Sequence, residues 1–343
     1  MALTNKLTAI ADAIRAKTGK TEELTLDQMV TEIEGISGGG GGEWFNDGDT
    51  HIWITLGEGR TSPMLGVCPN GTVTVDWGDG TTPDVLTGTS TSTVKWTPNH
   101  EYAKPGDYII KLTVDGVVHF SGSSSSNAYS YILRMSKNSS STNRCYQNAV
   151  KKIEIGNSVT SIGNYAFYNC SSLSSIVIPD GVTSIGNYAF ASCYNLSSIV
   201  IPDGVTSIGN YAFQYCNILS SIVIPDGVTS IGNYAFNYCY NLSSIVIPDG
   251  VTSIATGAFN SCTSLSSIVI PDGVTSIGNY AFQYCSGIRL YDFSSHTAVP
   301  TLSATPAFND IASDCEIRVP AALYDEWIAA TNWSTYKRNI VAV

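Results

Sequence analysis

The sequence is poor in charge, and the shortage is greatest in its middle. Only 13% of the 343 residues are charged, and no Lys, Arg, His or Glu occurs from Ile176 through Ile288. A catalytic acid–base pair therefore cannot be assembled in that stretch. The 17 Lys and Arg residues form no basic run and are outnumbered by 28 Asp and Glu, which gives a net charge of -11. This balance argues against a surface that neutralises phosphates, so we expect no nucleic-acid partner.

Long apolar runs are also missing. The chain opens "MALTNKLTAIADAIRAKTGK", where polar residues break the apolar run well short of a signal-peptide core, and no stretch approaches the length of a bilayer span. We therefore expect neither export nor membrane insertion by the chain itself. His51, His100, His119 and His296 are scattered without a nucleophile or a metal-ligand spacing beside them. The expectation is no enzyme, no catalytic residue, no metal and no cofactor.

Hydrophobic residues make up 43% of the sequence, enough for the chain to fold, and its length indicates more than one domain. Residues 1–37 predict a short helical hairpin with Leu3, Leu7, Ile10 and Ile14 on one face. A hairpin of this size cannot bury enough surface alone, so it should dock on a partner or on copies of itself. The glycine-rich residues 38–43 predict a flexible linker.

Residues 44–122 predict a small β-sandwich, because short alternating strands such as "HIWITL" and "YIIKLTV" are separated by Gly, Pro, Asn and Asp turns. The runs "VTVDWGDGTTPDV" and "HEYAKPGDYIIKLTV" resemble the core of polycystic-kidney-disease (PKD) type domains, which implies an immunoglobulin-like spacer. Asp76 and Asp79 lie in its turn. A cation site remains open there, but carboxylates that bond to nearby backbone amides are favoured.

A 23-residue repeat dominates the second half of the chain. Each unit follows "IVIPDGVTSIGNYAFxxCxxLSS", which predicts a strand, a Pro-Asp-Gly turn, a second short strand and a helical turn. Six such units run from Ile153 to Leu290, and stacked coils would bury a continuous core. We predict a solenoid over residues 153–293, a connector and N-terminal cap over 123–152, and a C-terminal cap over 294–343. The whole chain is then multidomain α+β.

The repeats resemble the BspA-like, treponeme-type leucine-rich repeats. That resemblance implies a surface-exposed bacterial or phage protein that binds other molecules without transforming them. The first unit departs with "IGNS" and the fifth with "ATG", and both changes spare the apolar positions. The residues of the second unit that match the family pattern are Leu173, Ile176, Ile178, Pro179, Val182, Ile185, Ala189, Phe190 and Cys193.

A cysteine and an aspartate also recur with the same 23-residue period, so that each would form a row along the solenoid. A row of cysteines could bind metal or form disulfides, but paired zinc-ligand spacings are absent, and buried reduced thiols are favoured. A row of aspartates from Asp180 to Asp272 could hold cations, although Asp is ordinary in a Pro-Asp-Gly turn. The cysteines are Cys170, Cys193, Cys216, Cys239, Cys262 and Cys285.

The pairs of residues that flank each cysteine vary between units, and they are mostly Tyr, Asn and Ser. Neutral drift on a surface would also introduce Lys, Glu and Arg, and none is present there. Tyr gives contact area at low entropic cost and Asn gives adaptable hydrogen bonds, so we interpret these pairs as a binding face for a saccharide or a protein loop. The predicted ligand-binding residues are Tyr168, Asn169, Tyr194, Asn195, Tyr215, Asn217, Asn237, Tyr238, Tyr240, Asn241 and Tyr284.

The function expected first is that of a phage tail-tip or tail-fibre protein that recognises a host-cell surface saccharide or protein. Such a protein is made in the bacterial cytoplasm and resides in the virion. Residues 1–35 resemble the short helical segments of phage tail proteins, which implies that 1–37 attach to a tail or baseplate protein. The alternatives are a BspA-like adhesin on the bacterial cell surface and a cytoplasmic scaffold.

Deleting residues 1–37 should convert a homo-oligomer, which we expect to be a trimer, into a folded monomer. The reason is that the apolar stripe of the two helices needs cover from other copies. Light scattering coupled to size exclusion measures the mass of both proteins. An unchanged oligomeric mass after the deletion would show that the head is not the assembly element.

Overall fold

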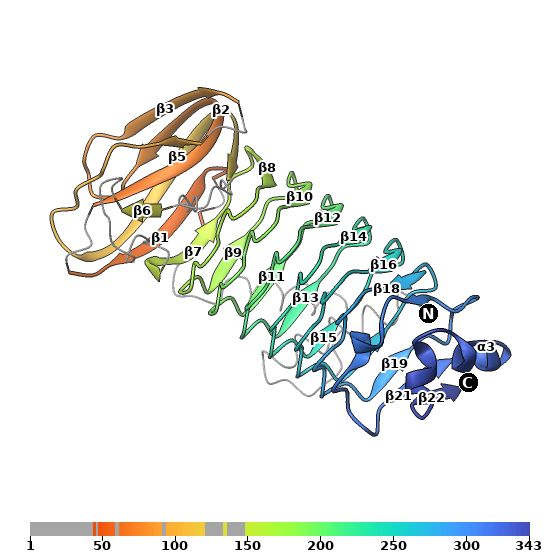
Figure 1. Ribbon diagram of the computed structural model, residues 1–343. Coiled ribbons are helices and arrows are strands. Elements are labelled where there is room, and N and C mark those ends of the chain that lie inside the picture. Colours follow the sequence, from red (N-terminus) through yellow and green to blue (C-terminus); the bar gives the residue numbers. More distant parts are fainter. Residues whose placement is uncertain (1–43, 46, 59–61, 91–93, 121–132, 136–147) are drawn as a thin grey trace.

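The structure is a computed structural model, and it describes residues 44–45, 47–58, 62–90, 94–120, 133–135 and 148–343. The predicted helical hairpin and glycine linker lie outside the described residues, as does most of the predicted connector. Within the described part, an antiparallel β domain sits at one end of a long stack of coils and a small helical cap at the other (Figure 1). This part is mostly β rather than the α+β mixture that was predicted.

The β domain forms where the sequence predicts alternating strands. Its long second strand pairs antiparallel with four others, β3, β4, β5 and β6. The turn carboxylates behave as predicted, since Asp76 accepts from the amide of Gly78 at 2.9 Å and Asp79 accepts from the amide of Thr81 at 3.1 Å. The strands are β1 (Thr50–Leu56), β2 (Pro63–Asp76), β3 (Asp84–Thr89), β4 (Lys95–Trp96), β5 (Gly106–Phe120) and β6 (Leu133–Met135).

An independent two-sheet sandwich is not supported, because this domain and the first coils share one 12-stranded sheet. Strand β1 pairs antiparallel with β5 and with β7 (Val150–Glu154), while β5 also pairs in parallel with β8 (Val159–Ile162). Strands β1 and β5 therefore cover the first coil, the role that the sequence assigned to residues 123–152. The side chain of Phe120 on β5 packs on that of Phe167, with ring centroids 5.7 Å apart.

Buried charged residues reinforce this junction. The Lys152 ammonium lies 3.5 Å from the centre of the Trp44 ring and 4.4 Å from that of Trp53. Glu154 on the same strand accepts from the backbone amide of Phe45 at 2.9 Å. Burial lowers the pKa of Lys152, and the cation–π contacts compensate part of the desolvation. The β domain is thus locked to the solenoid and is not a free spacer.

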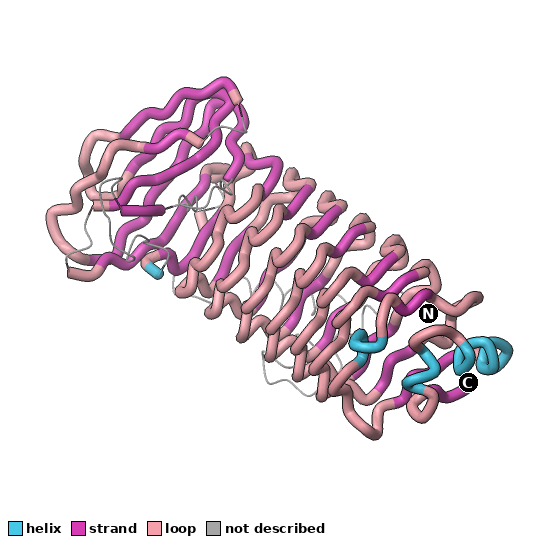
Figure 2. The backbone as a smooth tube through the Cα atoms, viewed as in Figure 1, coloured by secondary structure: helices cyan, strands magenta, loops and turns pink. Residues whose placement is uncertain are grey.

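The solenoid coils present two columns of short parallel strands (Figure 2). Equivalent residues pair one period apart, as Ile199 does with Ile222 and Ile185 with Ile208. After β7, the first column contains β9 (Ser175–Val177), β11 (Ser198–Val200), β13 (Ser221–Val223), β15 (Ser244–Ile245), β17 (Ser267–Val269) and β19 (Leu290–Asp292). After β8, the second contains β10 (Ser184–Ile185), β12 (Ser207–Ile208), β14 (Ser230–Ile231), β16 (Ser253–Ile254), β18 (Ser276–Ile277) and β20 (Thr301–Leu302).

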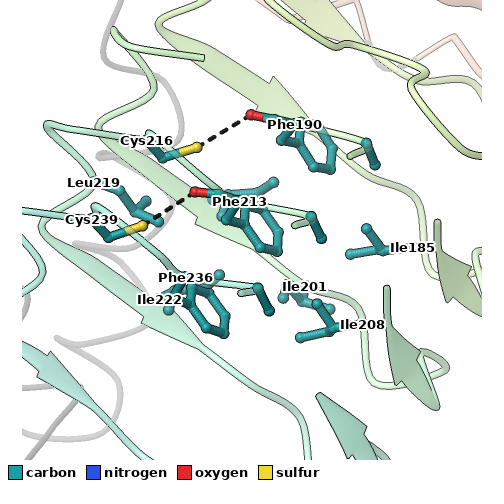
Figure 3. Packing of buried hydrophobic residues seen from close by; sticks show 14 of the residues in the cluster. Ile185, Phe190, Ile201, Ile208, Phe213, Cys216, Leu219, Ile222, Phe236 and Cys239 are labelled. Atoms are coloured by element: carbon teal, nitrogen blue, oxygen red, sulfur yellow. Dashed lines mark hydrogen bonds between the residues drawn. The ribbon is translucent and has the colours of Figure 1, made fainter. Parts of the chain in front are cut away.

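A column of stacked phenylalanines runs through the core (Figure 3). Neighbouring rings lie 5.3 to 5.6 Å apart from Phe167 to Phe282, and the column ends on Phe308 of the cap. Each ring from Phe190 to Phe282 is fully buried, and burying one contributes about 1.5 to 3 kcal/mol. The apolar residues that recur in every repeat are therefore conserved within the chain because they stack on one another in the core.

The cysteine ladder is part of the same core, as predicted. The thiol of Cys216 donates to the carbonyl oxygen of Phe190 at 3.3 Å, and that of Cys239 to Phe213 at 3.2 Å (Figure 3). The described cysteines are free and buried. Burial raises the pKa of each ladder thiol from Cys193 onward, to about 12 for Cys285. Cysteine suits this position because it is small and can still donate one bond.

The coils continue past the six repeats that the sequence predicts. Tyr291, Ile317 and Ile340 follow Ile268 in register, and the 23-residue spacing is broken only between Tyr291 and Ile317, which are 26 residues apart. The predicted tail strand and helix are present, with Trp327 fully buried. The described residues include no helix that could cross a bilayer. The remaining elements are 3₁₀ helices η2 (Thr305–Phe308), η3 (Ala321–Leu323) and η4 (Trp333–Tyr336), helix α3 (Tyr324–Ala329), and strands β21 (Glu316–Val319) and β22 (Ile340–Ala342).

Alkylation by iodoacetamide at pH 9 should be at least about 100-fold slower for Cys193, Cys216 and Cys285 in the native protein than in guanidinium. At that pH the thiolate fraction stays small in the folded chain, because the pKa of Cys285 is raised from 9.0 to about 12. Peptide mapping by mass spectrometry follows each site. Fast native labelling, or a disulfide between repeats, would contradict the buried ladder.

Candidate functional site

The predicted face lies on the segment that links the second strand of each coil to the first strand of the next. The sequence predicted a helical turn here, but the structure has consecutive tight turns. In the second unit the amides of Tyr188, Phe190 and Ser192 donate to carbonyls one coil further on, at 2.7 to 2.9 Å. The intervening amides bond within their own turn, as that of Ala189 does to Gly186. The amide of every second residue is therefore hydrogen-bonded to the next coil. A helix is excluded, because its amides would bond within the same segment.

Two residues of each turn adopt a left-handed backbone, four positions apart. In the second unit these are Tyr188, with φ 57°, and Ser192, with φ 62°. A side chain other than glycine is uncommon in this region and costs of order 1 kcal/mol or more. The bonds between coils offset that cost. The side chain of Asn187 adds to them by accepting from the amide of Asn210 at 2.7 Å.

The first left-handed position carries a tyrosine ladder that the sequence analysis did not single out. Tyr165, Tyr188, Tyr211 and Tyr234 stack with centroids 4.5 to 5.1 Å apart and interplanar angles of 5° to 9°. We call these four residues the constant tyrosine ladder. Burial and neighbouring tyrosines raise the pKa of Tyr188 to about 12. The "GNY" that recurs in five of the six units was the available signal, but it did not distinguish a surface stack from a core position.

In the third to sixth units, the position two residues before the cysteine forms a ladder of amides, and this corrects one predicted site residue. Gln214 donates to Asn237 at 3.0 Å, Asn237 to the Asn260 side chain at 3.0 Å, and Asn260 to Gln283 at 3.2 Å. Asn237 is only 4% exposed. It holds neighbouring coils together instead of facing a ligand.

The second left-handed position and the position after the cysteine carry the variable tyrosines. Tyr215 stacks on Tyr238 at 4.7 Å and 8°, and Tyr238 contacts Tyr240 at 5.7 Å. Burial and the neighbouring Tyr238, Tyr240 and Tyr194 raise the pKa of Tyr215. These four residues form one cluster across the second, third and fourth units. We call the column that contains Tyr215, Tyr238 and Tyr284 the variable tyrosine ladder.

Exposure divides the predicted residues into two groups. Tyr284 is 50% exposed, Tyr194 40% and Tyr240 39%, and Asn195 and Asn241 are exposed beside them. Of the others, Asn237 is buried and the rest are half-buried. Tyr168 packs against Tyr165 and Tyr188 of the constant ladder, Asn169 joins the backbone network, and the Asn217 amide nitrogen, turned toward the backbone, donates to the Tyr238 carbonyl at 3.1 Å. The face is thus narrower than predicted.

The arrangement offers contact area and neutral hydrogen-bonding groups. The described residues contain no cluster of three or more His, Cys, Asp or Glu that could hold a metal ion. Asp180, Asp203, Asp226 and Asp249 are exposed in the Pro-Asp-Gly turns, and Asp272 accepts from the amide of Thr297 at 2.8 Å.

Comparison with protein families agrees with this geometry. The model of the BspA type leucine-rich repeat region, in six copies, matches residues 138–247 and 206–312. Together these ranges span about half of the 343 residues. The chain belongs to the BspA-type leucine-rich repeat family. The family model begins after the β domain, so the PKD resemblance stays a prediction. No curated protein matches this BspA-type chain.

Several solved structures are similar to this BspA-type protein. A leucine-rich repeat protein from Bacteroides ovatus ATCC 8483 is 28% identical, with 50% of this chain and 56% of that chain covered and a TM-score of 0.38. The T. pallidum leucine-rich repeat protein TpLRR is 33% identical over 40% of this chain and 64% of its own, with a TM-score of 0.38. A leucine-rich cell surface protein from Faecalibacterium prausnitzii A2-165 is 25% identical over 51% and 74%, with a TM-score of 0.22. The chain therefore spans less than two thirds of the first two.

Replacing Asn237 by Ala should lower the free energy of unfolding by about 1 to 3 kcal/mol, because the Gln214 amide nitrogen loses its acceptor and the buried Asn260 amide oxygen loses one of its two donors. Asn241→Ala, on the exposed side of the same cysteine, should change stability by less than about 0.5 kcal/mol. Urea unfolding measures both. Equal stabilities of the two variants would show that the amide ladder contributes nothing.

Proposed function

We propose that this BspA-type protein is a non-catalytic binding protein of the bacterial cell surface, an adhesin that attaches through the face beside its cysteine ladder. The observation that supports this most directly is the exposure of Tyr194, Tyr240 and Tyr284 among residues that flank the cysteines and include no Lys, Arg or Glu. Large aromatic side chains in a neutral polar surround are typical of recognition surfaces.

The geometry favours recognition because the scaffold is rigid. The backbone amides of the variable tyrosine ladder are hydrogen-bonded to the next coil, as Tyr215 is to Asn237 at 2.9 Å and Tyr238 to Asn260 at 2.9 Å. A prearranged face loses little entropy when a partner binds. The amide ladder beneath it, from Gln214 to Gln283, fixes the spacing of the rungs.

The second candidate is a phage tail receptor-binding protein, favoured by the resemblance of residues 1–35 to phage tail segments. In this proposal residues 1–37 bind a tail or baseplate protein and trimerise, and the same face binds a saccharide or protein of the host cell. The family membership favours the adhesin. Immunogold labelling distinguishes the two, since an adhesin decorates the cell envelope and a tail protein decorates the phage particle.

The triple variant Tyr194→Ala, Tyr240→Ala and Tyr284→Ala should lose about 100-fold or more in affinity for cells, because each exposed aromatic anchor contributes about 1 to 2 kcal/mol. Flow cytometry of labelled protein on bacterial and on cultured epithelial cells measures the effect. The fold should persist, because these rings are the least buried of the predicted tyrosines.

The matched control replaces Val200, Val223 and Val269 by Ala. These side chains are 41% to 50% exposed on the first column of strands, away from the variable residues. We expect unchanged cell binding. Loss of binding in the valine variant, with the tyrosine variant unaffected, would place the binding surface on the sheet and overturn the proposal.

A further inference from the structure

The outward side of the first column of strands carries a row of valines, one at the equivalent position of five successive coils. Val200 pairs in register with Val223, and the isoleucines on either side of each valine are buried. Val200 is 50% exposed, Val223 41% and Val269 44%. Contiguous exposed apolar surface, unlike a single exposed side chain, marks an interaction site. The valine row consists of Val177, Val200, Val223, Val246 and Val269.

An acidic row lies along one side of the valine row. Three residues after each valine comes the aspartate of the Pro-Asp-Gly turn, and Asp180, Asp203 and Asp249 are exposed. The outward position on the other side of the valine is a serine, as in Ser198 and Ser221. From Ile176 through Ile288 the chain has no cationic residue beside these aspartates. The surface therefore suits an apolar partner with positive charge along one edge.

The N-terminal segment enters the described structure at one end of this row. The backbone amide of Phe45 donates to the Glu154 carboxylate at 2.9 Å, and Glu154 pairs in register with Val177, the first valine. The ring of Trp44 lies on the ammonium of Lys152, which is on the same strand as Glu154. Residues 1–43 therefore join the described chain beside the first coil of the valine row.

The first predicted helix is complementary to this surface in charge. Residues 1–20 contain four Lys or Arg and one Asp, whereas residues 21–37 contain five Asp or Glu and no Lys or Arg. At about 100° per residue, Lys6 and Lys17 fall along one side of the apolar stripe, and Asp12 falls on the opposite face of the helix. Of the two directions in which such a helix can lie along the row, one puts the lysines beside the aspartates.

The dimensions of the helix and the row also agree. At the spacing of stacked strands, Val269 lies about 19 Å from Val177. The apolar stripe from Leu3 to Ile14 is about 17 Å long in a helix. The glycine linker of residues 38–43 adds up to about 20 Å when extended, so the helix can reach along the whole row.

We propose that residues 3–17 dock as a helix on the valine row of the same chain, with the apolar stripe on the valines and with Lys6 and Lys17 beside the aspartates. A tethered segment has an effective concentration of the order of mM, so it competes well against a second copy. The docking covers two apolar surfaces at once and needs no other copy to cover the stripe. It leaves the variable tyrosines exposed, so it does not depend on the proposed function.

Photocrosslinking of the full chain tests the contact. Ile10→benzoylphenylalanine places a photoreactive group in the middle of the stripe, and Asp12→benzoylphenylalanine is the matched control on the opposite face of the helix. Cleavage before aspartate releases one peptide per coil, because Asp recurs once in each. We expect position 10, and not position 12, to crosslink to peptides 180–202, 203–225 and 226–248, which contain valines of the row. A mixture of ¹⁵N-labelled and unlabelled protein shows whether each crosslink joins one copy or two.

Hydrogen exchange measures how the docking depends on the row. The triple variant Val200→Ser, Val223→Ser and Val269→Ser removes the apolar contact, and the fold should persist because serine already occupies the other outward position of these strands. We expect the amides of residues 3–17 to exchange at least tenfold faster in this variant. The matched control replaces three exposed threonines beside the second column and should leave that exchange unchanged. Its substitutions are Thr206→Ala, Thr229→Ala and Thr252→Ala.

Three results would overturn the inference. Crosslinks that join labelled to unlabelled copies would assign the stripe to a second copy, as would a native oligomer that becomes a monomer when residues 1–37 are deleted. Equal exchange rates in the valine and threonine variants would show that the stripe does not lie on the valine row. Binding to cells through the tyrosine face is unaffected by any of these results.

Discussion

The architecture depends on one constraint, the hydrogen bonding that holds each coil in register with the next coil, 23 positions along the chain. These bonds run through the turns as well as the strands, as in the donation at 2.8 Å from the Phe190 amide to the carbonyl of Ala212, the residue before the equivalent Phe213. Because this register places each residue beside its equivalent in the next coil, like side chains stack on like. The phenylalanine column, the thiol bonds, the amide ladder and both tyrosine ladders all follow from this register.

The stacking of identical side chains also decides which side chains are free to bind a partner. In a column of parallel rings or amides, the side chains stack on one another or hydrogen-bond to one another, as the Asn237 and Asn260 amides do at 3.0 Å. These groups are then not available to a partner. The groups left for a partner are those that point away from the column, such as Tyr240, and those at an interruption. Variation between repeats is therefore a poor measure of exposure. The position of Asn237 varies between repeats and is buried, whereas Asn241 varies and is exposed.

The sequence predicted what depends on the period alone, namely the solenoid, the apolar core and the buried cysteines. It could not separate Asn237 from Asn241, because their different exposure depends on the left-handed backbone at Tyr238, and no residue type in "NYCYN" dictates that sign of φ. It also missed the fusion of the β domain with the first coil. That fusion depends on pairing between β5 and β8, which are remote in sequence and carry no turn signal between them. The prediction of a helical turn was wrong because alternate amides of this segment bond to the next coil, which is also remote in sequence.

A uniform solenoid has a specific physical weakness as a receptor. Every coil offers the same groups as the next, so a repetitive ligand can slide along the axis with little change in free energy. The third to sixth units break this uniformity, with Tyr215 and Tyr238 stacked, Ser261 small and Tyr284 isolated and exposed. Under the proposed function, these differences between units fix the position of a ligand along the axis, because Tyr194, Tyr240 and Tyr284 are exposed rings that it can contact. Specificity then comes from the differences between units, while affinity is spread over the exposed rings.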